Sequence, residues 1–251
     1  MTQPAGAIAP VLPHAFGIDP VKRRERLFFG GMAVVLAATV FAGFSRTFYL
    51  RPILDTGNVL TPSLIVHGAA FSAWMVLLLA QTSLIAVRRV DLHRKLGVAG
   101  AALGVTMMAL GAYVAISRTS DGTFVNPNGV PPLVFLAVPL ATVAVFPALI
   151  GAALYLRRNT AAHKRLMLIA TLELATAAIA RLPVVGPAGP IGFFGGTDLF
   201  LLAIVAYDLA TLKRVHPATI WGGLFLIASQ PLRLVVGGSE PWLALARWMT
   251  G

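Results

Sequence analysis

Seven apolar runs, most of them about as long as a membrane-spanning helix, dominate the sequence. They cover approximately residues 27–45, 63–87, 96–117, 131–156, 165–185, 194–212 and 217–237, and charged residues or Pro and Gly bound each of them. A helix of about 20 apolar residues crosses the hydrocarbon layer of a bilayer. Only 12% of the residues are charged, against about a quarter in a soluble domain. The sequence therefore predicts an all-α, polytopic transmembrane helix bundle of about seven helices.

The basic residues alternate between the two ends of these predicted helices. Fourteen of the 20 Lys and Arg lie in the N-terminal tail and in the turns at 88–95, 157–165 and 213–214. Cytoplasmic loops carry such an excess, so we expect a cytoplasmic N-terminus and an external C-terminus in a bacterial-type inner (plasma) membrane. The net charge of +11 then reflects orientation in the bilayer, and no nucleic-acid partner is expected.

The chain divides into a tail and one membrane domain. Residues 1–20 are rich in Pro, Ala and Gly without a helical period, which is typical of a disordered or surface-lying segment. The basic cluster that follows precedes a long apolar run, as in a signal-anchor helix. We expect residues 21–251 to form a single transmembrane helical domain.

Polar residues inside the predicted spans are the candidate functional positions, because they are costly in lipid and usually face the bundle interior or a cavity. His67, Trp74 and Gln81 recur every seven residues, which places them on one face of a helix. Glu173 is expected near mid-membrane with no basic residue at its depth, so burial would favour its neutral form. Arg181 and Asp198 are expected at one depth and are predicted to pair.

The first functional hypothesis is a protein that binds or transports a small anionic or amphiphilic ligand. Arginine at the rim favours an anion, and an outward-facing polar cavity would be lined by His67, Trp74, Glu173, Arg181, Asp198, Gln230 and Arg233. The alternative for these residues is a structural network of hydrogen bonds and ion pairs, with Trp74 in a packing stripe and a neutral Glu173 bonded to a helix backbone.

A second group of candidates lies at the cytoplasmic face, where His93, His163 and His216 each begin a predicted helix. Together with Asp91 and Asp208 they could bind a divalent metal such as zinc or iron, provided that the helix starts converge. Two of these histidines, or His67 with a methionine, could instead ligate haem b. Contact with lipid headgroups is the alternative. The absence of cysteine excludes thiolate sites and disulfides.

The turn "DLHRKLG" follows a helix that ends in "QTSLIAVRR", and the preceding helix contains His67 and Trp74. This arrangement resembles poorly characterised bacterial multi-pass membrane protein families with a His-Arg turn between helices. The resemblance covers the second and third helices, with "HKRLM" as a partial echo, and implies an integral membrane protein. It differs from cytochrome b561-like proteins, whose haem ligands lie within helices at both leaflets.

Two further classes of function stay open beside ligand binding. One is a haem- or metal-dependent membrane oxidoreductase that uses the cytoplasmic-face histidines. The other is a structural subunit of a larger membrane complex, because a small bundle with short loops can pack its lipid-facing surface against other subunits or against copies of itself. The lipid bilayer is the partner common to all three hypotheses.

Overall fold

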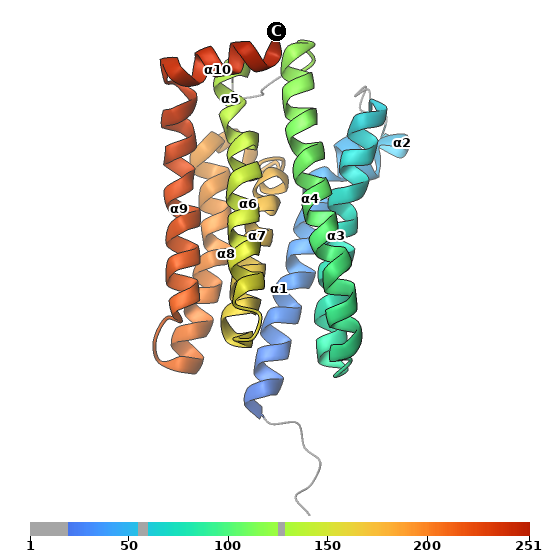
Figure 1. The fold of residues 1–251 in the computed structure, drawn as a ribbon, viewed down its shortest axis with the longest axis vertical. Coiled ribbons are helices and arrows are strands. Elements are labelled where there is room, and N and C mark those ends of the chain that lie inside the picture. The colour runs from blue at the N-terminus through green and yellow to red at the C-terminus, as the bar shows by residue number, and fades with distance from the viewer. Residues whose placement is uncertain (1–19, 55–59, 125–128) are drawn as a thin grey trace, which may run out of the picture.

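The computed structural model describes residues 20–54, 60–124 and 129–251, and these residues are mostly helical with no strand. The predicted tail over residues 1–20 lies outside the described residues except for Pro20, where the first helix begins. Seven long helices form an up-and-down bundle (Figure 1): α1 (Pro20–Phe44), α3 (Pro62–Ala86), α4 (Val90–Ser120), α6 (Ala137–Tyr155), α7 (Thr160–Ile179), α8 (Gly189–Leu212) and α9 (Pro217–Gly237). The predicted all-α helix bundle is confirmed.

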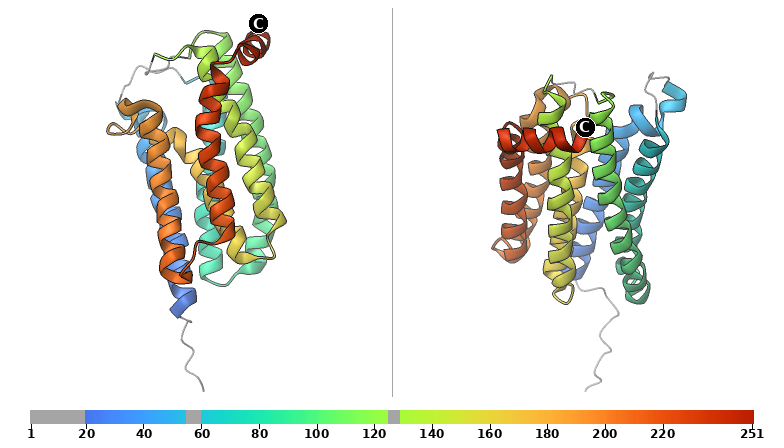
Figure 2. Two further views of the ribbon diagram at one scale, coloured as in Figure 1. Left: turned by 90° about the vertical axis from the view of Figure 1, so that its left-hand side faces the viewer. Right: turned by 45° about the horizontal axis from the view of Figure 1, so that its top comes forward.

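Five short elements connect or cap the long helices. They are a π-helical turn, η1 (Ser45–Tyr49), and a 3-10 turn, η2 (Gly186–Ala188), with the helices α2 (Arg51–Leu54), α5 (Pro132–Phe135) and α10 (Glu240–Thr250). The sequence did not predict α10, which lies across the end of the bundle where α9 finishes (Figures 1 and 2). The Trp242 indole donates to the carbonyl oxygen of Leu133 at 2.8 Å and so fixes α10 to α5.

Six helical stretches of the described chain are long and apolar enough to cross a membrane: 20–49, 62–86, 90–120, 132–155, 186–212 and 217–237. These stretches identify a multi-pass membrane protein. The expected count of about seven spans is not confirmed, because α7, which corresponds to the predicted run 165–185, is not among the six. This helix carries Lys164, Arg165 and Glu173 and ends at Ile179, short of Pro183.

The helix α7 forms the centre of the bundle. It packs against α1, α6, α8 and α9, and 14 of its 20 residues are buried. Its polar side chains therefore contact protein and not lipid, which explains how a helix with three charged residues lies inside an apolar bundle.

The basic turns lie together at one end of the bundle. The start of α1 and the connections α3–α4, α6–α7 and α8–α9 are at the lower end in Figure 1, and α10 is at the upper end. We call these the basic end and the α10 end. Side chains define where two helices start at the basic end: Asn159 accepts from the Ala162 main-chain N–H at 3.1 Å, and His216 Nδ1 accepts from that of Ala218 at 3.1 Å.

Candidate functional site

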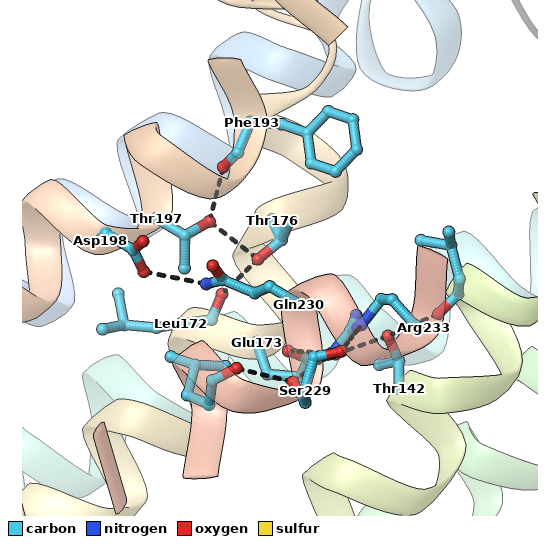
Figure 3. Close-up of polar contacts among 12 residues, drawn as sticks. Thr142, Leu172, Glu173, Thr176, Phe193, Thr197, Asp198, Ser229, Gln230 and Arg233 are labelled. Atoms are coloured by element: carbon cyan, nitrogen blue, oxygen red, sulfur yellow. Dashed lines mark hydrogen bonds and ion pairs between the residues drawn. The ribbon is translucent and has the colours of Figure 1, made fainter. Parts of the chain in front are cut away.

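A buried polar network joins α6, α7 and α9 around the ion pair of Glu173 and Arg233 (Figure 3). Arg233 Nη1 donates to Glu173 Oε1 at 2.9 Å and Nη2 donates to Oε2 at 3.2 Å. Thr142 donates to Glu173 Oε1 at 2.7 Å. Both charged side chains are 1% exposed. Such a two-pronged contact matches the planar guanidinium to the planar carboxylate and is among the strongest hydrogen-bonded pairs in proteins.

The expectation of an isolated Glu173 is therefore wrong. The sequence showed no basic residue near mid-membrane on its own helix, but the fold brings Arg233 from α9 to the same depth. Ser229, one turn before Arg233, accepts from the guanidinium through both its carbonyl oxygen, at 3.1 Å, and its hydroxyl, at 2.7 Å. The pair is neutral as a whole and well hydrogen-bonded, which is the condition for keeping two charges in an apolar interior.

A second set of hydrogen bonds lies beside this pair, between α7, α8 and α9 (Figure 3). Gln230 Nε2 donates to Asp198 Oδ1 at 2.8 Å, and the Thr176 and Thr197 hydroxyls are 2.8 Å apart. The predicted pair of Arg181 and Asp198 does not form, because the Asp198 carboxylate bonds Gln230 and Arg181 lies in the connection that follows α7, against other residues.

Trp74 is buried, as predicted from the periodic stripe on its helix. Its indole N–H donates to the Thr171 hydroxyl at 3.3 Å, and its ring packs edge-to-face on Phe146 with centres 5.1 Å apart. It is 4% exposed. Trp74 thus joins α3 to α6 and α7 and presents no open wall to a ligand.

His67, Arg181 and Arg118 form a separate group toward the α10 end, which we call the outer basic cluster. The Arg181 charge acts on His67, and the Arg118 charge acts on Arg181. Within the described part of the chain none of the three makes an ion pair with a carboxylate. His67 Nδ1 and Arg118 Nε are also buried without a hydrogen-bond partner.

Aromatic rings support two members of this cluster. The Arg181 guanidinium lies over the Phe44 ring, 4.5 Å from its centre, and the His67 imidazole stacks on Phe71 with ring centres 4.3 Å apart. Arg118 donates to the Thr123 carbonyl oxygen at 2.6 Å. The cluster thus combines positive charge with apolar faces.

Two hollows among the described residues are apolar, and neither contains the predicted ligand-binding residues. One, of about 40 Å³, lies among α5, α6, α8 and α9. The other, of about 290 Å³, is an open groove between α3 and α4 lined by Ala73, Val76, Leu77, Ala80, Leu96, Ala99, Gly100 and Leu103. Both are apolar, so neither is the outward-facing polar cavity that we expected, and Glu173, Gln230 and Arg233 are buried instead.

The basic end contains a second buried ion pair, between Arg165 of α7 and Asp208 of α8. Arg165 Nε donates to Asp208 Oδ1 at 2.9 Å. Asp208 Oδ2 accepts from the Thr219 hydroxyl at 2.6 Å and from the main-chain N–H of His216 at 3.1 Å. Asp208 thereby ties α7, α8 and the start of α9 together, and all of its hydrogen bonds are to protein.

The five residues predicted to bind a metal, His93, His163, His216, Asp91 and Asp208, do not form one site. Asp91 is exposed and pairs with Arg89 at 3.3 Å, while His216 caps α9. Burial, followed by the Arg165 charge, lowers the pKa of the His216 imidazole and favours the neutral form that this cap requires. No group of three or more His, Asp or Glu among the described residues could hold a metal ion. Only His93 and His163 approach each other, with ring centres 6.4 Å apart.

Several participants in these networks were not predicted as site residues. Thr142, Ser229, Thr176 and Thr197 are ordinary residues in apolar runs, and hydroxyls in such runs commonly bond their own helix backbone. The spacing of Ser229 and Arg233, four residues apart, does indicate that they share a face of α9. Arg118 was counted only as a basic residue of the external side.

Comparison with known protein families, with curated proteins and with solved structures gives no match for this chain. The resemblance to bacterial multi-pass families with a His-Arg turn stays a prediction.

Proposed function

We propose that this multi-pass membrane protein binds a small amphiphilic anion at the outer basic cluster, with its acidic head on Arg181 and Arg118, beside His67. The proposal includes the predicted orientation, with the basic end in the cytoplasm of a bacterial-type cell and the cluster toward the external side.

One contrast carries the proposal. The buried charges among the described residues are matched one to one, Glu173 with Arg233 and Arg165 with Asp208. The outer basic cluster has no carboxylate partner in the described part of the chain. The charges of Arg181 and Arg118, which this part of the chain does not neutralise, and the buried Arg118 Nε–H, which has no hydrogen-bond partner there, favour an anionic ligand such as a carboxylate or a phosphate.

The surroundings of the cluster support an amphiphile over a small hydrated ion. Phe44 and Phe71 lie beneath Arg181 and His67 and offer apolar surface next to the charges. An acidic head can take charge-assisted hydrogen bonds from the guanidinium groups, while the attached hydrocarbon lies on the rings. The fully bonded Glu173–Arg233 pair is then a structural support beneath the site.

Calorimetric titration of the full chain in phosphatidylcholine nanodiscs tests this function. Octanoate is the amphiphilic anion, octanol is the uncharged amphiphile, and inorganic phosphate is the anion without a tail. We expect octanoate to bind most tightly. Its affinity should fall with salt, because Arg181 is exposed and salt screens exposed charges. Arg181→Gln and Arg118→Gln should each weaken octanoate binding by about 10- to 100-fold, the equivalent of one charged hydrogen bond.

Arg247→Gln is the matched control, because Arg247 is an exposed arginine of α10 and lies 3.8 Å from Glu240. It should leave octanoate binding unchanged. Equal binding of octanol, or unaltered octanoate binding by Arg181→Gln, would show that the outer basic cluster does not bind the head group. Binding of phosphate as tight as that of octanoate would reject the amphiphile.

A further inference from the structure

We infer that His93 and His163 form a two-coordinate site for one soft monovalent metal ion, Cu(I) or Ag(I), at the basic end of the bundle. His93 lies in the first turn of α4 and His163 in the first turn of α7. The site is at the opposite end of the molecule from the outer basic cluster and does not depend on the function proposed there.

The separation of the two rings fits a shared ion. Their centres are 6.4 Å apart and their planes are almost perpendicular, at 86°. Two imidazole nitrogens on opposite sides of one ion, each at a metal–nitrogen distance of about 2 Å, place the ring centres about 6 Å apart. Linear coordination leaves each ring free to rotate about the nitrogen–metal axis, so perpendicular planes are compatible with it.

The hydrogen bonds of the two imidazoles leave nitrogen atoms for a ligand. His163 Nδ1 lies 2.8 Å from the Ala153 carbonyl oxygen. A carbonyl oxygen only accepts, so Nδ1 carries the proton and Nε2 has the free lone pair. Metal-binding histidines commonly hold their second nitrogen in this way. His93 Nδ1 is buried without a hydrogen-bond partner, which an ion bound there would explain.

The absence of acidic partners selects the kind of ion. The nearby carboxylates are engaged, since Glu25 bonds Lys164, Asp91 bonds Arg89 and Asp208 bonds Arg165. Zn²⁺ in proteins usually takes four ligands, and no group of three candidate ligands exists in the described part of the chain. Arg94 also places positive charge near His93, which repels a divalent ion more than a monovalent one. Cu(I) and Ag(I) accept two neutral imidazoles.

The test is a titration of the purified full chain in detergent with Ag(I), and with Cu(I) under anaerobic conditions against a chromogenic Cu(I) chelator. We expect one ion per chain, with Zn(II) bound more weakly. X-ray absorption of the Cu(I) form should show two nitrogen neighbours. His93→Ala and His163→Gln should each weaken binding by more than about 100-fold, since even loss of a residue that only supports a ligand costs 10- to 100-fold. In the His163→Gln protein, the side-chain amide can still donate to the Ala153 carbonyl oxygen, so only the metal-binding nitrogen is lost.

His216→Asn is the control. Asparagine keeps a hydrogen-bond acceptor for the start of α9, and the change removes the third histidine that the described residues place at the basic end. It should bind Ag(I) as the unaltered protein does. Circular dichroism melting of each variant shows whether it is folded. Retained binding in a folded His93→Ala or His163→Gln protein, tighter binding of Zn(II) than of Cu(I), or a haem Soret band that depends on His93 would overturn the two-coordinate site.

Discussion

Glu173 and Arg233 show how a charged residue is kept inside this bundle. Each of the two carboxylate oxygens accepts from the guanidinium, and hydroxyl groups of Thr142 and Ser229 complete the contacts. Removing two charges from water costs several kcal/mol per ion, and their attraction offsets this cost only when the pair is well hydrogen-bonded. Neither residue can therefore be changed alone without leaving its partner buried and unpaired.

We expect Glu173→Gln to lower the free energy of unfolding by about 3–5 kcal/mol, because Arg233 would remain buried without a counter-charge. From the sequence alone, with Glu173 isolated and neutral, the same substitution would leave folding near normal. The double change Glu173→Leu with Arg233→Met should recover most of the loss, since an apolar pair of similar volume needs no neutralisation. Thermal unfolding in detergent measures both effects.

Glu240→Gln serves as the matched control, because Glu240 is 86% exposed and its nearest contact to Arg247 is 3.8 Å. Its stability should equal that of the unaltered protein. If Glu173→Gln unfolded at the same temperature as the unaltered protein, the ion pair would contribute nothing to stability.

At the scale of elements, α7 holds the bundle together by close packing with α1. A side-chain carbon at Gly43 of α1 would collide with the main-chain carbonyl group of Ala178 in α7. The added carbon would meet main-chain atoms of Ala178, so no change of side-chain rotamer could relieve the collision. Gly30, on the same helix, has open space around it.

Gly43→Ala should therefore destabilise the protein by about 1–3 kcal/mol, the usual cost of overpacking a well-packed interior. Gly30→Ala adds the same methyl group to the same helix without a clash. It should be neutral or stabilising by up to about 1 kcal/mol, because alanine favours helix over glycine. The melting temperature of Gly43→Ala should lie below that of Gly30→Ala. Equal melting temperatures would show that α1 and α7 are not in contact at Gly43.

At the scale of the whole molecule, the basic turns gather at one end (Figure 1). The turns between α3 and α4, α6 and α7, and α8 and α9 are all there, and α10 covers part of the opposite end. Arginine and lysine in short loops set orientation during insertion. The gathering of the basic turns at one end of the bundle therefore predicts that this end faces the cytoplasm.

Reporter fusions test this orientation. Fusions within 88–95 and 157–165 should be active only as cytoplasmic reporters, and a fusion within 118–130 only as an external reporter. Agreement at all three places requires both the predicted orientation and an odd number of crossings between 118–130 and each basic turn. Reversed activities would place the basic end outside.

The fold class and the gathering of the basic turns could be predicted because they depend on local sequence. An apolar run of about 20 residues becomes a helix in lipid, where backbone groups have no other partners. The predicted runs 63–87, 194–212 and 217–237 correspond closely to α3, α8 and α9. The polar positions on these helices can also be named from the sequence, since hydrophilic residues in apolar runs are conspicuous.

The tertiary structure alone decided which polar residues meet. Position along its helix gives the depth of Arg233 or of Arg181 to within a few residues. The rotation of each helix about its axis and the helices beside it then determine which partner each arginine meets. Thus Glu173 pairs with Arg233 and Asp198 bonds Gln230, while Arg181 joins His67 and Arg118. The same cause separates His216 from His93 and His163. Sequence fixes a residue's height in the bilayer, and only helix packing fixes the side it faces.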